Sequence, residues 1–149
     1  MKWTFKKYKE LTLDEFHAIL QLRIDVFVVE QNCPYSELDN KDKLAYHLFA
    51  FAEEKPNEII AYTRIFKPGD YYKHAAFGRV VVHPNYRKKE FGRVLIQETI
   101  HKIEEYLNTS TIRIGAQTYL QKFYESFDFK QDGDPYIEDE IPHIYMIRN

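Results

Sequence analysis

The sequence predicts a fold of the α/β or α+β class, in which helices cover both faces of a sheet. The first observation is the predicted order: strand, helix, three strands, helix, strand, helix and two strands. The second is the unbroken apolar run Val80-Val81-Val82, which is typical of a central strand covered on both faces. The third is residues 92–107, where apolar side chains recur at helical spacing. A length of 149 residues suits one domain, so we expect a single domain over residues 1–149.

The first helix has a clear start signal. Thr12 and Glu15 stand three positions apart, as in a capping box, where each side chain bonds to the backbone of the other residue. Apolar residues at helical spacing continue the helix to about Phe27. Pro34 disfavours helix at the residue before it, so residues 30–35 are predicted to form a loop.

The other elements are predicted from alternation, β-branched runs and helical periodicity. The charged segment 36–43 fits either a loop or a short helix. Strands are expected over residues 3–8, 46–53, 59–67, 77–83, 111–115, 129–131 and 143–148, and helices over residues 92–107 and 120–127. Residues 137–140 are expected to form an acidic loop before the last strand.

Composition excludes several classes of protein. Apolar residues make up 44% of the chain, with 12 Tyr and 11 Phe, which supports a packed core and excludes intrinsic disorder. No apolar run is long enough for a membrane helix, and the N-terminus lacks a signal peptide. The single cysteine, Cys33, allows no internal disulfide and no zinc site of its own. The missing signal peptide and the single cysteine lead us to expect a cytoplasmic protein, and we expect no metal because the scattered histidines show no metal-ligand spacing. A formal net charge of -2 argues against nucleic-acid and membrane partners.

The most informative segment follows the valine-rich strand. It concentrates four cations and one anion in seven residues, directly before a helix: Arg87, Lys88, Lys89, Glu90, Phe91, Gly92 and Arg93. The first turn of a helix offers free amide donors and partial positive charge, which suit a phosphate group. The alternative is a solvated basic loop before an ordinary helix. Neither a Walker loop nor a dinucleotide fingerprint is present.

The segment Arg87-x-x-Glu90-x-Gly92 resembles the R/Q-x-x-G-x-G/A motif of the GNAT N-acetyltransferases. Residues 123–129 resemble the later segment of that superfamily, which places a tyrosine near the coenzyme A sulfur. Matches over residues 22–35, 78–82 and 141–146 make the chain similar to the ElaA-like subgroup.

This resemblance implies the GNAT acyl-CoA N-acyltransferase fold, a mixed twisted sheet that is flanked by helices and splays where the cofactor enters. It implies acetyl-CoA as cosubstrate, held by the backbone of Val80, Val81 and Val82 and by residues 87–93. Two residues depart from the pattern, because Glu90 and Asp128 stand where the family has glycine. Such positions often need a positive φ or close approach of a ligand, so we expect weaker coenzyme A binding.

Tyr124 is the acid that the resemblance implies for the coenzyme A thiolate, although its apolar stripe also fits a plain core residue. Candidates for the base are Glu30, which otherwise is a solvated carboxylate, and His47, which otherwise is a core residue. A third is His143, for which a structural hydrogen bond is the alternative. A nucleophilic role of Cys33 is disfavoured, because no neighbouring residue in the sequence would activate its thiol.

The resemblance implies direct transfer of an acetyl group from acetyl-CoA to a primary amine in a ternary complex. The acceptor is expected to be a small molecule or a protein, with Glu138 and Asp139 attracting a cationic amine or simply forming a solvated loop. The departures at Glu90 and Asp128 also fit a non-catalytic module that senses acyl-CoA or binds a protein. Related folds often form homodimers, but the sequence identifies no interface.

Overall fold

The structure, a computed structural model, describes residues 1–149. Its strands are β1 (Thr4–Lys7), β2 (Tyr46–Phe51), β3 (Ile59–Phe66), β4 (Ala76–Val82), β5 (Ile112–Gln117), β6 (Lys130–Gln131), β7 (Tyr136–Glu138) and β8 (Ile141–Arg148). Its α-helices are α1 (Leu13–Arg23), α2 (Phe91–Leu107) and α3 (Gln121–Glu125). Shorter helical segments are η1 (Tyr8–Glu10), η2 (Ile24–Glu30), η3 (Asn40–Lys43), η4 (Pro84–Tyr86) and η5 (Thr118–Leu120).

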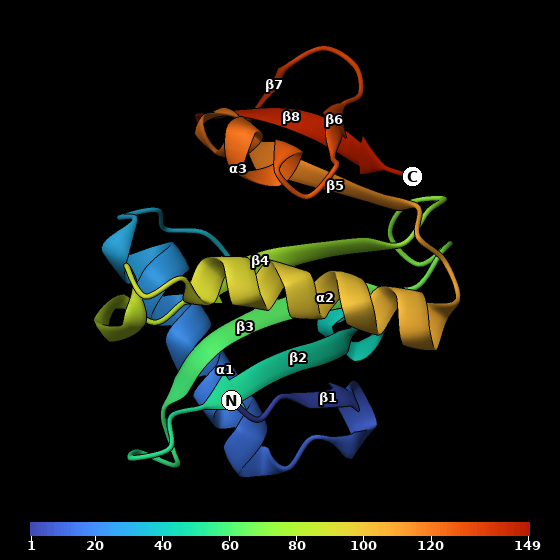
Figure 1. Ribbon diagram of the computed structural model, residues 1–149. Helices are drawn as coiled ribbons and strands as arrows, with labels where there is room; N and C mark the ends of the chain where they lie inside the picture. The colour runs from blue at the N-terminus through green and yellow to red at the C-terminus, as the bar shows by residue number, and fades with distance from the viewer.

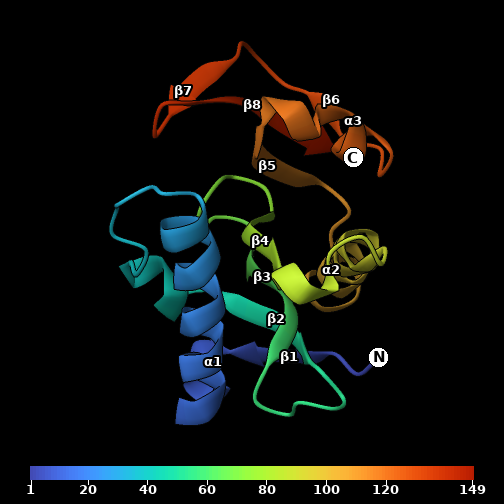
Figure 2. The ribbon, with the colours of Figure 1, turned by 90° about the vertical axis from the view of Figure 1, so that its left-hand side faces the viewer.

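The strands form two antiparallel sheets. The first has the order β1-β2-β3-β4, and the second has the order β5-β8-β6, with β7 also paired to β8. Figures 1 and 2 show α1 and α2 on opposite faces of the first sheet, with the second sheet and α3 beyond the β4 edge. The expected mixed sheet is thus two antiparallel sheets, joined by one parallel bridge between Ala75 and Ile112.

The start of α1 follows the predicted capping box. The Thr12 hydroxyl accepts a bond from the Glu15 amide at 3.0 Å, and the Glu15 carboxylate accepts one from the Thr12 amide at 2.9 Å. The helix does not end near Phe27, because η2 carries it on to Glu30 as a π-helix. The predicted loop therefore begins later than expected, and Asn32 follows with a positive φ of 49°.

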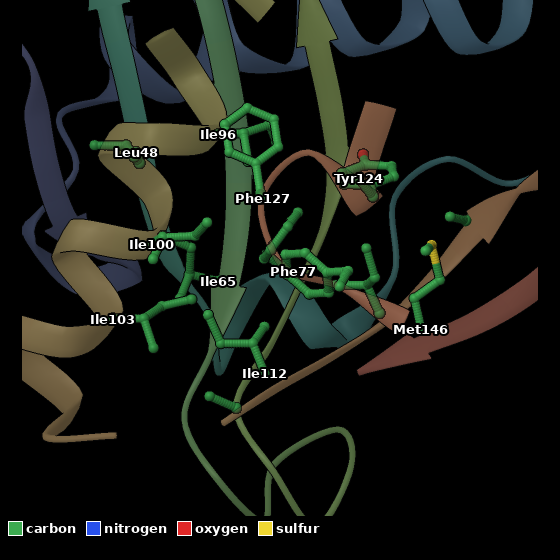
Figure 3. Close-up of a cluster of buried hydrophobic side chains, with 14 of the residues drawn as sticks. Leu48, Ile65, Phe77, Ile96, Ile100, Ile103, Ile112, Tyr124, Phe127 and Met146 are labelled. Atoms are coloured by element: carbon green, nitrogen blue, oxygen red, sulfur yellow. The ribbon is translucent and has the colours of Figure 1, made fainter. Parts of the chain in front are cut away.

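The core lies on both faces of the first sheet. α1 packs Ile19 and Leu22 against Phe49 and Tyr62, which point to one side of β2 and β3. A larger cluster joins α2 to the other side and to the second sheet, as Figure 3 shows; its members include Leu48, Ile65, Phe77, Ile96, Ile100, Ile103, Ile112, Tyr124, Phe127 and Met146. Because this cluster contains residues of both sheets, it fixes the second sheet against the first.

The C-terminal segment differs from the prediction in one respect. Residues 137 and 138 belong to β7, which pairs with β8 in a hairpin, and only Asp139 and Glu140 form the turn. Both turn residues have positive φ values, 50° and 65°, as tight hairpin turns require. The expected acidic loop is therefore a strand and a turn, and it carries its carboxylates on the edge of the second sheet.

Candidate active site

A cleft of about 770 Å³ is lined by residues of both β4 and β5. The two strands are bonded at one end only, where the Arg113 amide donates to the Ala75 carbonyl at 2.8 Å. Beyond this point they belong to separate sheets, so their facing backbone groups are not used by a shared ladder. A splayed pair of strands can therefore offer main-chain amides to a ligand in the cleft.

The floor of the cleft contains a β-bulge in β4. Tyr62 pairs with Val81 and Arg64 with Gly78, so Arg79 and Val80 together face a single residue of β3. Arg79 has a φ of 52°, the left-handed conformation that a side chain disfavours. The side chains of Val80 and Val82 line the cleft, whereas Val81 is buried. The predicted valine segment thus reaches the cleft with two of its three side chains.

The loop before α2 adopts a cradle-like backbone. Lys88 and Glu90 have φ values of 68° and 63°, and the first helical bond of α2 runs from the Val94 amide to the Glu90 carbonyl at 3.1 Å. The amides at the helix start therefore have no partner within the helix. Gly92 lines the cleft, and a Cβ built on it would meet no atom within 4 Å. This arrangement suits close approach of an anion.

Two arginines of this loop are held by contacts within the protein. Arg87 donates to the Val82 carbonyl at 3.1 Å and to the Glu30 carboxylate at 2.6 Å. The Arg93 guanidinium lies 4.6 Å from the centre of the Phe127 ring. Glu30 is a partner of the phosphate-loop arginine and is not part of the cleft lining. Of the predicted loop residues, only Gly92 lines the cleft, and Arg87, Lys88, Lys89, Glu90, Phe91 and Arg93 lie outside the lining.

Tyr124 lies in the wall of the cleft, at the edge of the hydrophobic core. Its ring packs against Phe77 and Phe129, at centroid distances of 6.3 and 5.9 Å. Figure 3 shows its hydroxyl oxygen pointing away from the labelled core residues. Burial raises the pKa of the Tyr124 hydroxyl above its ordinary value, so the group stays protonated at neutral pH. Tyr124 is therefore a residue of the hydrophobic core that also lines the cleft.

His143 lies on β8 and lines the opposite wall of the cleft. Its Nδ1 is 2.7 Å from the Ile141 carbonyl, so this nitrogen carries the proton. The lone pair of the neutral ring is then on Nε2, which lies 3.6 Å from the Glu138 carboxylate. The imidazole also stacks on Tyr136, at a centroid distance of 5.5 Å. Of the two histidine candidates, His143 is the one that the structure brings to the cleft.

His47 does not lie in the cleft. It is 0% exposed, and both ring nitrogens are occupied, Nδ1 by the Tyr62 hydroxyl at 2.7 Å and Nε2 by the Asp42 carbonyl at 3.0 Å. Burial lowers the pKa of His47 to about 4, so the ring is neutral at physiological pH. The expectation of a catalytic His47 is corrected accordingly, because neither nitrogen is free to accept a substrate proton.

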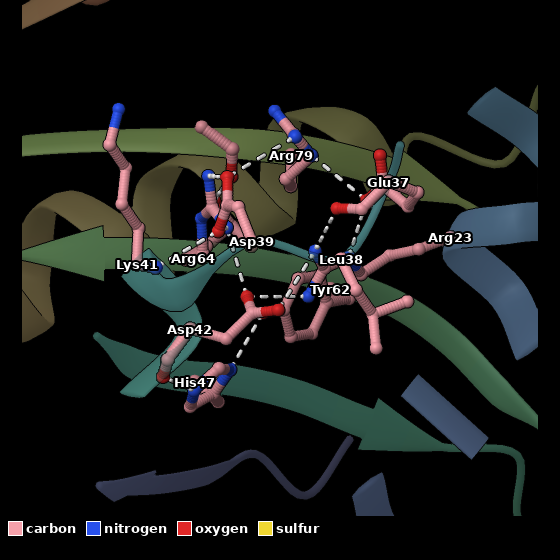
Figure 4. Close-up of polar contacts among 12 residues, drawn as sticks. Arg23, Glu37, Leu38, Asp39, Lys41, Asp42, His47, Tyr62, Arg64 and Arg79 are labelled. Carbon is pink, nitrogen blue, oxygen red and sulfur yellow. Dashed lines mark hydrogen bonds and ion pairs between the residues drawn. The ribbon is translucent and has the colours of Figure 1, made fainter. Parts of the chain in front are cut away.

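One large feature was not anticipated from the sequence. It is a largely buried set of ionic residues, which we call the arginine–carboxylate network: Arg23, Arg64, Arg79, Glu37, Asp39 and Asp42 (Figure 4). Arg64, Arg79 and Asp39 also line the cleft. Three guanidinium groups face three carboxylates, so the charges balance. Balanced and hydrogen-bonded charges are the form in which ions are tolerated in a protein interior.

The network connects α1, the loop after η2 and the floor of the cleft. Arg23 is 0% exposed and contacts Glu37 at 2.7 Å and Asp42 at 2.8 Å. Arg64 contacts Asp42 at 2.9 Å and Asp39 at 2.8 Å. Burial opposes the charge of Asp39, but the nearby guanidinium groups outweigh it and hold its pKa below the ordinary value. The charged segment 36–43 is thus fixed against the sheet.

Around the network and the second sheet, the cleft is rich in aromatic residues. Those that line it beside Tyr124 are Phe27, Tyr35, Phe66, Tyr71, Tyr72, Phe77, Tyr119, Phe123, Tyr136 and Tyr145. Glu138 and Asp139 stand at its rim, and Glu138 is mostly exposed. Cys33 also lines the cleft.

No group of three or more His, Cys, Asp and Glu side chains is arranged to hold a metal ion. No helix here combines the length and apolar character that crossing a bilayer requires.

Comparison with known proteins agrees with this architecture. The Acetyltransferase (GNAT) domain matches residues 18–149. The ElaA protein of Escherichia coli K12 is 37% identical over 150 residues, which cover 99% of this chain and 96% of that protein. The crystal structure of E. coli ElaA superposes with a TM-score of 0.90 at 36% identity, and each chain is covered to 99%.

A solved acyl-CoA N-acyltransferase from Pseudomonas aeruginosa superposes with a TM-score of 0.92 at 37% identity, and again each chain is covered to 99%. These likenesses extend over both sheets and the cleft between them, so the predicted GNAT acyltransferase fold is confirmed. The family model covers most of the chain and the ElaA relative is matched over nearly its full length, so the chain belongs to the GNAT acetyltransferase family, with ElaA among its relatives.

Proposed function

We propose that this protein is an N-acyltransferase that moves an acetyl group from acetyl-CoA directly to a primary amine in a ternary complex. One observation carries the proposal: Gly92, at the start of α2, and Tyr124 line the same cleft. The cleft thereby combines helix-terminal amides, which suit a pyrophosphate, with a protonated hydroxyl, which suits a leaving thiolate. The acceptor is a small molecule or a protein that presents an amine.

The phosphate loop fits the pyrophosphate of coenzyme A. The open space at Gly92 lets an oxygen approach the backbone, and Lys88 and Glu90 already hold left-handed conformations that glycine would otherwise supply. The Glu90 side chain makes no capping bond to α2, so the amides at the helix start stay available. Arg87 and Arg93 offset the Glu90 charge at this end of the cleft.

Acyl transfer requires three events at the thioester. The amine nitrogen, once deprotonated, bonds to the carbonyl carbon; the carbonyl oxygen takes up negative charge; and the carbon–sulfur bond then breaks, which releases a thiolate. In this proposal, backbone amides of the bulged segment of β4 polarise the carbonyl, as in other oxyanion holes. Tyr124 donates its proton to the sulfur as the charge develops there.

His143 is our candidate for the base. Its Nε2 carries the lone pair, because Nδ1 donates to the Ile141 carbonyl at 2.7 Å. The ring lies in the cleft wall beside Glu138, whose carboxylate attracts the ammonium form of the acceptor before deprotonation. Glu30 does not serve as base in this proposal, because its carboxylate is bonded to Arg87 outside the cleft lining.

Two measurements test the proposal. Calorimetry with acetyl-CoA and with free coenzyme A measures donor binding, and thiol release with a library of amines measures transfer. We expect micromolar donor binding, and we expect Tyr124→Phe to lower kcat by about 10²-fold while donor affinity is retained. Tyr106→Phe is the matched control, because Tyr106 is an exposed residue near the far end of α2.

The outcomes separate the two classes of function. Donor binding without transfer to any amine would contradict an enzyme and favour the acyl-CoA-sensing alternative that Glu90 and Asp128 motivate. The positive φ of 63° at Glu90 and of 70° at Asp128 shows that both positions keep the left-handed conformation without glycine. Absence of donor binding would overturn the assignment of the phosphate loop.

A further inference from the structure

Of the residues with a left-handed backbone other than glycine, only Arg79 lies inside a strand. The others are in loops, in turns or at the ends of helices. We propose that Glu37 is a positioning residue for acyl transfer: it holds the Arg79 side chain and thereby keeps the β4 bulge in the form that presents backbone amides to the cleft. This inference rests on the proposed function and assigns a role to a residue outside the cleft lining.

The bulge needs such a support because its backbone conformation is unfavourable. The left-handed region is unfavourable for a residue with a Cβ, and such strain persists only where the surroundings fix it. Arg79 Nε donates to Glu37 Oε2 at 2.9 Å, and Arg79 Nη2 lies 3.7 Å from Asp39 Oδ2. The first contact is short and its carboxylate is buried, so Glu37 is the stronger of the two anchors.

Glu37 is itself fixed from the opposite side. Its Oε2 also accepts from Arg23 Nε at 2.7 Å, and its Oε1 accepts from the Tyr35 hydroxyl at 2.6 Å. Arg23 belongs to α1 and is fully buried, so the carboxylate cannot follow a movement of the bulge. Figure 4 shows Glu37 between Arg23 and Arg79, which makes it the link between α1 and β4.

The position of the bulge connects this link to the reaction. Arg79 and Val80 face a single residue of β3, Thr63, and the Thr63 hydroxyl donates to the Gly78 carbonyl at 3.1 Å. The strand is therefore secured just before the bulge, and Glu37 secures it at the bulge. A bulge bends the strand and leaves a residue outside the ladder, which turns its backbone groups toward a neighbouring site. An error of about 1 Å in the position of a reacting group costs about 10² in rate. Loss of the support by Glu37 should therefore lower kcat more than it weakens the binding of acetyl-CoA.

The decisive comparison is between Glu37→Gln and Asp42→Asn. Both residues are buried, at 4% and 3% exposure, and both pair with Arg23, but only Glu37 contacts Arg79. We expect similar losses of thermal stability. Glu37→Gln should lower kcat at saturating acetyl-CoA by about 10- to 100-fold with KM for acetyl-CoA nearly unchanged, and Asp42→Asn should lower kcat much less. Equal losses of kcat in the two variants would overturn the proposal.

A second pair of variants separates support of the backbone from a direct role of the arginine charge. Glycine adopts the φ of 52° at position 79 without the Cβ penalty, whereas alanine does not. If the side chain acts by holding the bulge, Arg79→Gly should retain at least about tenfold more kcat than Arg79→Ala. Equal kcat in both, with recovery in Arg79→Lys, would show that the charge acts on a substrate and would contradict the proposal.

A third readout does not depend on activity. The backbone amide resonances of Val80 and Val81 in ¹⁵N-labelled protein report the bulge directly. We expect them to shift in Glu37→Gln and to remain in Asp42→Asn. If the protein transfers no acyl group to any amine, the proposed function fails, while these resonances still decide whether Glu37 holds the bulge. Unshifted resonances in Glu37→Gln would overturn the positioning role even in an active enzyme.

Discussion

The two walls of the cleft are built from different interactions. The wall of the first sheet is fixed by buried charges, of which Arg23 at 0% exposure is the centre. The wall of the second sheet is a stack of half-exposed groups: the Arg113 guanidinium lies 4.4 Å from the Tyr145 ring centre, and Tyr145 stacks on Tyr136 at 4.5 Å. Tyr136 continues the stack to His143.

This difference matches the tasks that we propose for the walls. Buried charges tolerate only one arrangement, because a buried carboxylate that loses its ion-pair partner has no water to replace it. Such a wall suits backbone amides that must stay in place at a thioester. Stacked rings at the surface can slide or tilt at small energetic cost, which suits contacts with an acceptor. The four predictions below test this contrast from the largest expected effect to the smallest.

The sharpest contrast is one substitution made in both walls. Arg23→Met removes the fully buried guanidinium that pairs with both Glu37 and Asp42, and it leaves the network with three carboxylates and two arginines. We therefore expect it to lower the free energy of unfolding by about 3–5 kcal/mol. Arg113→Met removes a half-exposed arginine that pairs with Asp132, and we expect a loss below about 1 kcal/mol. Urea unfolding of both variants measures the difference. Equal losses in the free energy of unfolding would contradict the contrast between a wall fixed by buried charges and a wall of stacked, partly exposed groups.

The second prediction is that the protein loses stability as the pH falls below 6.5. His47 has its pKa lowered from 6.5 to about 4 by burial, so the folded state binds fewer protons than the unfolded chain between these values. The contribution to stability is fully present above pH 6.5 and is lost as the pH falls toward 4, by roughly 3 kcal/mol in total. Unfolding by urea at a series of pH values measures the slope. In His47→Gln the free energy of unfolding should depend less steeply on pH between 6.5 and 4. An unchanged pH dependence would show that other groups cause it.

The third prediction probes the packing of the stacked wall. A Cβ on Gly115 would lie 2.5 Å from the Tyr136 hydroxyl, so Gly115→Ala must displace that ring. We expect a loss of about 1 kcal/mol in the free energy of unfolding, because a partly exposed ring is displaced more easily than a fully buried one. Adding Tyr136→Phe removes the clashing oxygen and should restore most of the loss. A double variant no more stable than Gly115→Ala would place the strain elsewhere.

The smallest effect on stability is expected for Glu30→Gln. The bond from Arg87 to Glu30 is 2.6 Å long but both side chains are about two-fifths exposed, at 40% and 42%. We expect the substitution to lower the free energy of unfolding by less than about 0.5 kcal/mol. We also expect about two- to fivefold tighter binding of coenzyme A, because Arg87 is then free to contact the pyrophosphate. Calorimetry measures the affinity. Unchanged affinity together with a collapse of kcat would restore Glu30 as candidate base.

Local signals explain what could be predicted from the sequence. The capping box at Thr12, the amphipathic α2 and the cationic loop before it each depend on residues close together in the chain, and the structure contains all three. The departures at Glu90 and Asp128 also point correctly to special backbone, since both positions have positive φ. Features that depend on interactions within a few residues of the chain can therefore be predicted from the sequence alone.

The arginine–carboxylate network was not predictable by the same means. Its members come from α1, the segment 36–43, β3 and β4, and each looks like an ordinary surface charge in its own neighbourhood. Only the fold brings Arg64 within 2.8 Å of Asp39 and Arg79 within 2.9 Å of Glu37. For the same reason His47 looked like a candidate base: its two partners, Tyr62 and the Asp42 carbonyl, are set by tertiary contacts.

The strand order of the second sheet has a consequence for biosynthesis. β5, β6 and β7 all pair with β8, which follows them in the chain. A nascent chain that has not yet exposed β8 to solvent can complete the first sheet, but it holds three strand segments without their common partner. During this interval the unpaired edges are open to association with other chains. Translation thus leaves one wall of the cleft unfinished until β8 has emerged, and a chaperone that shields these strands would act on this intermediate.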